Sequence, residues 1–173
     1  MPKRSERVID YSVFLNGNKY LGTATATLPE ITYLVETIKG GGIAGEIEAP
    51  SPGQTGAMSL ALTWRTIEEA AAELLAPVSH ALDLRASIQT FDTSTGEYKE
   101  SALKVTVRAR PLGLTLGNLE PAATMETTNN FSVSYLKVVL DQVSVLEIDK
   151  YNYIHKVHGT DYLKETRAHL AMN

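Results

Sequence analysis

Two acidic residues near the C-terminus are the first candidates for chemistry. Glu147 and Asp149 stand two positions apart in an alternating run, which places both carboxylates on one face of a strand, roughly 6–7 Å apart. Such a separation resembles that of the carboxylate pair of a glycoside hydrolase. Catalysis would also need a cleft that raises the pKa of one carboxyl group. Because nothing else in the run points to a cleft, we interpret the pair as part of a solvated or salt-bridged face.

A second cluster, formed by His155, His158 and Asp161, has residue types that bind metal ions. Positions three apart on a strand point to opposite faces, and Gly159 interrupts any helix that would align the two histidines. The spacing therefore predicts surface or interface histidines and no metal site.

Nucleotide and nucleophile motifs are also missing from the sequence. The run Gly40-Gly41-Gly42 lacks the following Lys-Ser/Thr and the strand–loop–helix frame of a P-loop. No Gly-x-Ser-x-Gly motif occurs, and the absence of cysteine excludes thiol nucleophiles, disulfides and thiolate metal ligands. We therefore predict that the protein is not an enzyme and needs no cofactor.

The charge balance argues against a protein that grips nucleic acid. The chain carries 16 Lys+Arg against 20 Asp+Glu, a net charge of −4, and so lacks a basic footprint. Lys104, Arg108 and Arg110 share one face of a predicted strand, and we expect them to pair with acidic residues of the same or a neighbouring subunit. No apolar run reaches the length of a membrane span or follows the basic N-terminus as in a secretory signal, so we expect no membrane anchoring.

The elements that position these residues are mostly strands. Apolar residues alternate with polar or small ones in nine segments, and each segment is expected to be a strand. The segments are 8–15, 20–28, 31–38, 58–64, 81–91, 98–110, 130–140, 143–149 and 154–157. A helix is predicted over 66–76, with Thr66 and Glu69 as a capping box, and a short C-terminal helix over 160–170. The pattern predicts a mainly β fold with α decoration, a sandwich or barrel, as a single domain over residues 1–173.

Two connecting segments are unusual. Residues 39–56 contain six glycines and two prolines and far exceed the common connection length of about 4–6 residues. We expect a long Gly-rich loop that orders against a neighbouring subunit. Residues 111–121 are expected to be irregular, and their four leucines to be buried against another protein, because exposed leucines promote aggregation. The candidate interface residues are Gly40, Gly41, Gly42, Ile43, Gly45, Ile47, Leu112, Leu114 and Leu116.

Several strings of residues, in order over nearly the whole chain, carry a family resemblance. They are Val13-Phe14-Leu15-Asn16-Gly17, Thr27-Leu28-Pro29-Glu30-Ile31, the glycine cluster of 39–45, Val145-Leu146-Glu147-Ile148-Asp149, and Gly159-Thr160-Asp161. The sequence thereby resembles the major tail tube protein of contractile-tailed bacteriophages, the P2-like family shared with R-type bacteriocins. It departs from that family at 111–121, which is leucine-rich where relatives tend to be charged.

The resemblance implies a β-barrel-like structural virion protein whose hexameric rings stack into the inner tail tube, the conduit for DNA ejection inside a contractile sheath. The implied partners are further copies of the chain, the tail sheath protein, and the tail terminator and baseplate proteins. DNA would pass through the lumen without specific binding, and assembly would take place in the host cytoplasm.

Two other functions remain open on the sequence. One is the tube protein of a type VI secretion system or of another contractile injection system without a genome. The other, from a different class, is a monomeric β-barrel module that binds a ligand under a lid formed by 39–56.

Overall fold

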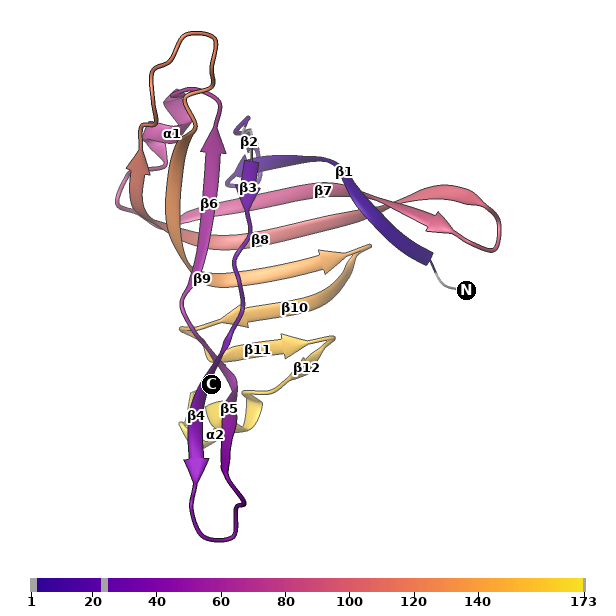
Figure 1. Cartoon of the computed structure of the whole chain (residues 1–173), viewed down its shortest axis with the longest axis vertical. Helices are drawn as coiled ribbons and strands as arrows, with labels where there is room; N and C mark the ends of the chain where they lie inside the picture. Colours follow the sequence, from indigo (N-terminus) through magenta and orange to yellow (C-terminus); the bar gives the residue numbers. More distant parts are fainter. Residues whose placement is uncertain (1–2, 23–24, 173) are drawn as a thin grey trace.

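The computed structural model describes residues 3–22 and 25–172. These residues form a ten-stranded sheet, antiparallel in every pairing, together with a separate two-stranded hairpin and two short helices (Figure 1). The elements are β1 (Lys3–Leu15), β2 (Lys19–Tyr20), β3 (Thr25–Thr27), β4 (Tyr33–Lys39), β5 (Glu46–Thr55), β6 (Met58–Trp64), α1 (Glu69–Glu73), β7 (His80–Asp92), β8 (Glu97–Thr115), β9 (Thr127–Leu140), β10 (Val143–Asp149), β11 (Ile154–Val157), β12 (Thr160–Asp161) and α2 (Lys164–His169). The predicted class, mainly β with helical additions, is confirmed.

Strand β9 is the point at which the sheet divides. On one side it pairs with β8; on the other, Thr127–Val133 pairs with β6 and Tyr135–Leu140 pairs with β10. One branch runs from β10 to β12, and the other folds over through β6 and β3, while β7, β1 and β2 continue the sheet beyond β8. The result is a curled sheet in which two branches leave the edge of β9 that faces away from β8.

The core lies inside this curl and follows the alternation of the strands. In β6, Met58, Leu60, Leu62 and Trp64 are buried, whereas the residues between them are more exposed. They belong to one cluster with buried side chains of β1, β7, β8, β9 and β10. Every second side chain of a strand points to the same face. The apolar residues that alternate along the strands in the sequence therefore make up most of this core.

Both helices are shorter than predicted. The expected helix over 66–76 spans only Glu69–Glu73; its N-cap is Glu68, which makes no side-chain capping bond, so the capping box at Thr66 was wrong. Ala71 and Leu74 are fully buried, and packing rather than capping therefore explains this turn of helix. At the C-terminus, Thr160–Asp161 pairs with β11 as β12, so the helix begins only at Lys164.

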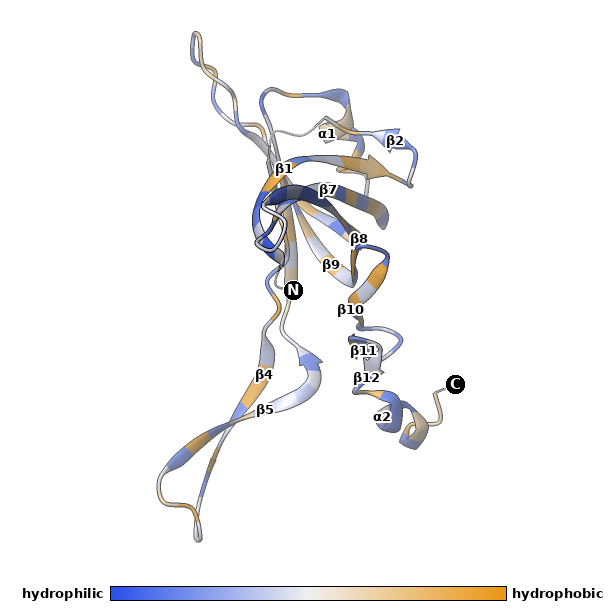
Figure 2. Cartoon of the chain, turned by 90° about the vertical axis from the view of Figure 1, so that its right-hand side faces the viewer, coloured by the Kyte–Doolittle hydropathy of each residue, from blue (hydrophilic) through white to orange (hydrophobic). Residues whose placement is uncertain are grey.

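The loop predicted over 39–56 is largely a strand, and this corrects the sequence interpretation. Residues 46–55 form β5, which pairs with β4 in the register Ile38 to Ile47 and Lys39 to Glu46. Its two prolines are tolerated because each strand of a two-stranded hairpin is an edge strand. We call residues 33–55 the arm. It extends away from the sheet to one end of the longest axis of the molecule (Figures 1 and 2).

The segment predicted to be irregular over 111–121 also differs, because β8 continues to Thr115. Leu112 is the extra residue of a bulge, since Pro111 pairs with Phe131 and Gly113 with Asn130. Irregular chain begins only at Leu116, and we call residues 116–126 the leucine loop. This loop lies at the end of the longest axis opposite to the arm (Figures 1 and 2).

Candidate assembly surfaces

The two acidic residues considered for hydrolysis are engaged in local structure. Glu147 accepts a hydrogen bond from the Tyr135 hydroxyl at 3.0 Å and pairs with Lys156 at 3.8 Å. Asp149 accepts the backbone N–H groups of Tyr151 and Asn152 and so closes the turn after β10. Burial, together with Glu147, raises the pKa of Tyr135 to about 12, which keeps this phenol a proton donor. The arrangement supports the interpretation of a salt-bridged face.

His155 is buried, which corrects the prediction of a surface or interface histidine. Only 1% of it is exposed, and its Nε2 lies 3.0 Å from the hydroxyl of Tyr33 at the start of the arm. Asp161 accepts hydrogen bonds from Arg167 at 2.6 Å and from the backbone N–H groups of Leu163 and His155, at 3.1 and 3.4 Å. Within the described residues, no three His, Asp or Glu side chains are grouped to hold a metal ion.

Because His155 is buried, the free energy of unfolding should depend on pH, and the direction of this dependence follows from the pKa of His155. Burial lowers the pKa of His155 below its ordinary 6.5, while nearby Asp161 acts in the opposite direction. As the pH falls, the imidazole of His155 is therefore protonated in the unfolded chain before it is protonated in the folded chain. Proton uptake favours the unfolded state, so the free energy of unfolding should fall as the pH is lowered from 6.5 toward the pKa of the folded state. Asp92 and Asp161, whose pKa values are lowered, lose their stabilising effect only at more acidic pH.

We expect urea denaturation to show this directly. Between about pH 7 and about pH 5.5, His155→Gln, which keeps a polar partner for Tyr33 but does not titrate, should lose less stability than the unmodified chain. The matched control is His158→Gln, at an exposed turn with φ of 46°. If the free energy of unfolding depended on pH equally in both variants, His155 would not be the source of the pH dependence.

The base of the arm is anchored to the rest of the molecule by several contacts. The Gly56 N–H donates to the Thr32 carbonyl at 2.8 Å, and the Lys150 ammonium donates to the Thr55 and Gly56 carbonyls. Gly53 packs closely on Leu163, and a Cβ at this position would lie 2.6 Å from the leucine side chain. The arm is therefore held in a fixed direction at its base.

The far end of the arm, in contrast, is exposed. The structure places the candidate residues Gly40, Gly41, Gly42, Ile43, Gly45 and Ile47 together at its tip. Ile38 and Ile47 face each other across the hairpin and are 46% and 54% exposed. Within the described chain, no atom lies within 4 Å of a Cβ placed on the four tip glycines. An isolated two-stranded hairpin is only marginally stable, so this tip is suited to contact with another molecule.

The three leucines predicted at an interface do not share one environment. Leu112 and Leu116 are 68% and 56% exposed. Leu114 packs against the core of its own subunit instead, because it returns to the inner face of the sheet after the bulge at Leu112. Leu119, the fourth leucine of the segment, was expected to be buried against another protein but was not among the candidate interface residues; it is 88% exposed in the leucine loop.

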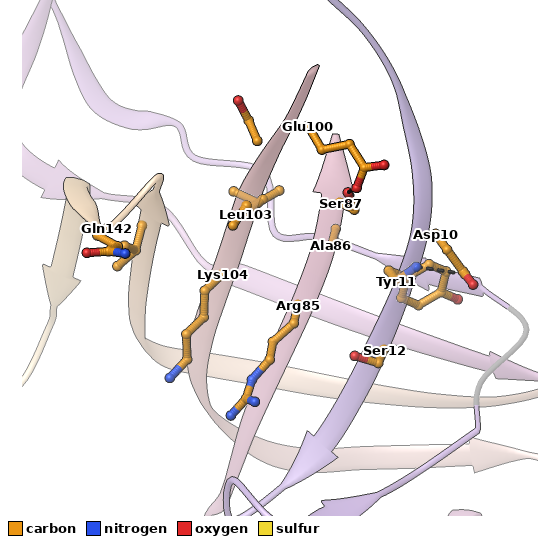
Figure 3. Close-up of a pocket in the computed structure, with 13 residues that line it drawn as sticks. Asp10, Tyr11, Ser12, Arg85, Ala86, Ser87, Glu100, Leu103, Lys104 and Gln142 are labelled. Atoms are coloured by element: carbon orange, nitrogen blue, oxygen red, sulfur yellow. Dashed lines mark hydrogen bonds between the residues drawn. The ribbon is translucent and has the colours of Figure 1, made fainter. Parts of the chain in front are cut away.

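The outer face of the sheet carries basic side chains with local partners. The register confirms that Lys104, Arg108 and Arg110 share a face, and Arg85 lies opposite Lys104 on β7. Figure 3 shows Arg85 and Lys104 side by side along an open groove of about 660 Å³. Both reach the carboxylate of Asp83, at 3.8 and 3.3 Å. Arg110 donates to the Tyr151 hydroxyl and lies over its ring.

No helix in the described part of the chain is both long and apolar enough to cross a bilayer. The surface features of the described residues thus include an exposed arm, an exposed leucine loop and a basic face on which Asp83 pairs with Arg85 and Lys104. All three suit assembly with other protein chains better than chemistry on a small molecule.

Comparison with known proteins agrees with this geometry. A family model described as phage tail tube protein FII matches residues 5–170. The tail tube protein of Escherichia phage P2 is 27% identical over 164 residues, which cover 93% of this chain and 94% of that protein. Among solved structures, the sheath/tube terminator of an extracellular contractile injection system aligns with a TM-score of 0.54 at 13% identity, over 78% of this chain and 95% of that one. The sheath–tube complex of such a system gives 0.48 at 11% identity, over 75% and 86%.

The resemblance noted in the sequence is thereby confirmed, and the similarity in fold extends to a component of a contractile system. Family membership indicates a structural role rather than an enzymatic one. Because the family model matches nearly the whole length, the chain belongs to the phage tail tube protein FII family.

Proposed function

We propose that this tail tube protein assembles into hexameric rings that stack into the inner tube of a contractile tail, with the sheath around the tube and DNA passing through it. Terminator and baseplate proteins would cap its two ends, and assembly would take place in the host cytoplasm. Family membership supports the tube, and the fold shared with the sheath/tube terminator of an injection system supports the contractile setting. The observation that carries the proposal is the exposed arm, which reaches beyond the body of the subunit.

The ends of the curled sheet provide surfaces for closing a ring. At one end, the outer edge of β1 is paired with β2 only at Phe14 and Leu15 among the described residues. At the other end, β11 and β12 are short. Unpaired edges invite pairing with another chain, and two different edges give a head-to-tail contact that can close into a ring. We place the lateral neighbours of the ring at these two edges.

The arm and the exposed leucines provide surfaces for stacking. The proposed interface residues are Gly40, Gly41, Gly42, Ile43, Gly45, Ile47, Leu112 and Leu116. Leu114 takes no part in this surface, since it packs on the core of its own subunit. Stacking would bury aliphatic side chains that are otherwise exposed to water, and it would order the glycine-rich tip.

The net negative charge of the subunit supports a tube through which DNA passes without binding to it. Six subunits at −4 each would give a ring of −24, which repels a phosphate backbone. Of the cations on the outer face, Arg85 and Lys104 share the carboxylate of Asp83, and Arg110 donates a hydrogen bond to the Tyr151 hydroxyl. We therefore expect the purified subunit to show no binding to duplex DNA tighter than about 100 µM at physiological salt.

Fluorescence anisotropy with a labelled duplex tests this prediction. Asp83→Asn, which frees Arg85 and Lys104 from their shared carboxylate, serves as a reference that should bind more strongly at low salt. Submicromolar, salt-sensitive binding by the unmodified subunit would contradict the proposal and would make Lys104, Arg108 and Arg110 a binding site.

Negative-stain electron microscopy with sedimentation tests the assembly itself. The proposal predicts rings or hollow filaments, whereas a ligand-binding module would sediment as a monomer of 18.8 kDa. Nucleic acid in the lumen of native particles would separate a phage tail from a genome-free injection system.

A further inference from the structure

Two exposed segments of this chain are free of charge in a sequence in which 21% of residues are charged. One is Gly40–Gly45, the tip of the arm, and the other is Pro111–Leu119, which leads into the leucine loop. Both views of the molecule place the arm and the leucine loop at opposite ends of its longest axis (Figures 1 and 2). Apolar, uncharged surface is thus present at both ends.

The leucine loop is a preformed surface. The Asn118 N–H donates to the Met125 carbonyl at 3.1 Å, and the Thr127 hydroxyl donates to the Leu116 carbonyl at 2.8 Å. Gly117 has a φ of +86°, and a Cβ on it would lie only 1.9 Å from the Met125 carbonyl oxygen, so the close approach of the two sides of the loop requires glycine. The loop therefore holds Leu116 and Leu119 outward in a defined position.

The tip of the arm has complementary properties. The Ile38–Ile47 pair offers a flat aliphatic face, and Ile43 lies in the turn beyond it. Gly40, Gly42 and Gly45 all have positive φ, a conformation that glycine adopts without strain, and the only side chains in the turn are those of Ile43 and Ala44. Lys39 and Glu46 pair with each other at 3.6 Å and, as neighbours of Ile38 and Ile47 along their strands, point to the opposite face of the hairpin. The aliphatic face of the tip can therefore lie against a shallow apolar surface.

Symmetry decides which surface meets which. Contact of an arm with an identical arm would be a two-fold contact, and it would join two rings face to face and stop there. The same holds for contact between two leucine loops. A tube in which all rings point the same way needs two different surfaces, one at each end of the subunit. The arm tip and the leucine loop are such a pair.

We infer that the arm tip (residues 38–47) of a subunit in one ring docks onto Leu112, Leu116 and Leu119 of a subunit in the next ring. This inference rests on the proposed function, since it assigns the two halves of the stacking contact within the tube. The partner of the leucine-rich segment is then another copy of the same protein, so tube growth requires no other protein at this contact.

Cross-linking in tubes tests the pairing, and the absence of native cysteine makes the experiment clean. The double variant Ile43→Cys/Leu119→Cys is assembled and treated with a short bismaleimide. Each subunit should become linked to the next ring, which gives a ladder of multimers on a denaturing gel. Ile43→Cys/Tyr98→Cys is the matched control, because Tyr98 is 65% exposed but lies on the β7–β8 hairpin, and it should give no ladder.

The outcomes separate the inference from the proposed function. Tubes that give a ladder with the first pair alone support the inference. Tubes without that ladder, or dimers formed by Ile43→Cys alone, overturn the pairing and leave the tube function intact. If the unmodified chain forms no tubes, the proposed function fails and the inference fails with it. Should the cysteines themselves block assembly, Ala44→Cys/Asn118→Cys probes the same contact at exposed neighbouring positions, with the same interpretation.

Discussion

Removing the outer half of the arm should abolish tube formation and leave the subunit folded. The variant lacks Thr37–Glu48 and joins Glu36 to Ala49 through an Asn-Gly turn, which matches the existing register of the hairpin. The base of the arm, with Tyr33 on His155 and Gly53 on Leu163, is retained. Because every residue of β4 is exposed, its outer half adds little to the core. Thermal unfolding should therefore change by only a few degrees.

The expected effect on assembly is large because it is multiplied around the ring. Burial of half-exposed Ile38 and Ile47 is worth about 1 kcal/mol for each side chain. Six arms acting together would contribute on the order of 10 kcal/mol to each contact between rings. The trimmed variant should thus remain as monomers or single rings at concentrations at which the unmodified chain forms long tubes.

Sedimentation and negative-stain microscopy on the same samples measure the outcome. The matched control is Thr37→Ser/Glu48→Gln, which alters a facing pair in the same hairpin without touching its isoleucines. That control should assemble normally. Tubes of ordinary length from the trimmed variant would show that the arm has no part in stacking.

The sequence predicts best those strands whose apolar residues alternate with polar or small ones between clear turns. Strands β6, β10 and β11 have the predicted bounds; in β6 the alternation follows burial, whereas β10 and β11 each bury a single residue. The predicted strands 130–140 and 143–149 leave Asp141 and Gln142 between them, and these two residues form the turn, both with positive φ. For these segments, local pattern and tertiary environment agree.

Strand β5 was missed because it lies outside the core. Its glycines and prolines are typical of a loop, and its pairing with β4 depends on a partner strand rather than on burial. His155 was misjudged for a related reason. The alternation along β11 separates His155 from His158, but the side that is buried depends on Tyr33 at the base of the arm, far away in the sequence.

Asn129 is one of the buried polar residues that the sequence analysis did not identify, and its replacement should have a large effect on stability. It is fully buried, accepts a hydrogen bond from the Trp64 indole at 2.8 Å and donates one to the Ala71 carbonyl at 3.0 Å. A single side chain thus joins β6, β9 and α1. The signal was present in the sequence, because Asn129 stands in phase with the buried Phe131 and Val133.

Asn129→Ala should therefore lower the free energy of unfolding by about 2–5 kcal/mol, because a buried indole N–H and a buried carbonyl both lose their partner, at roughly 1–3 kcal/mol each. In a domain of this size the loss corresponds to a fall of about 10 °C in Tm. Asn130→Ala is the matched control: it is the next residue of β9 but is exposed, and its Tm should stay within about 2 °C of the unmodified chain. Urea and thermal denaturation of the two variants give the comparison. Equal stabilities would mean that Trp64 and Ala71 find other partners, and that the contact of β6 and α1 with β9 depends on apolar packing alone.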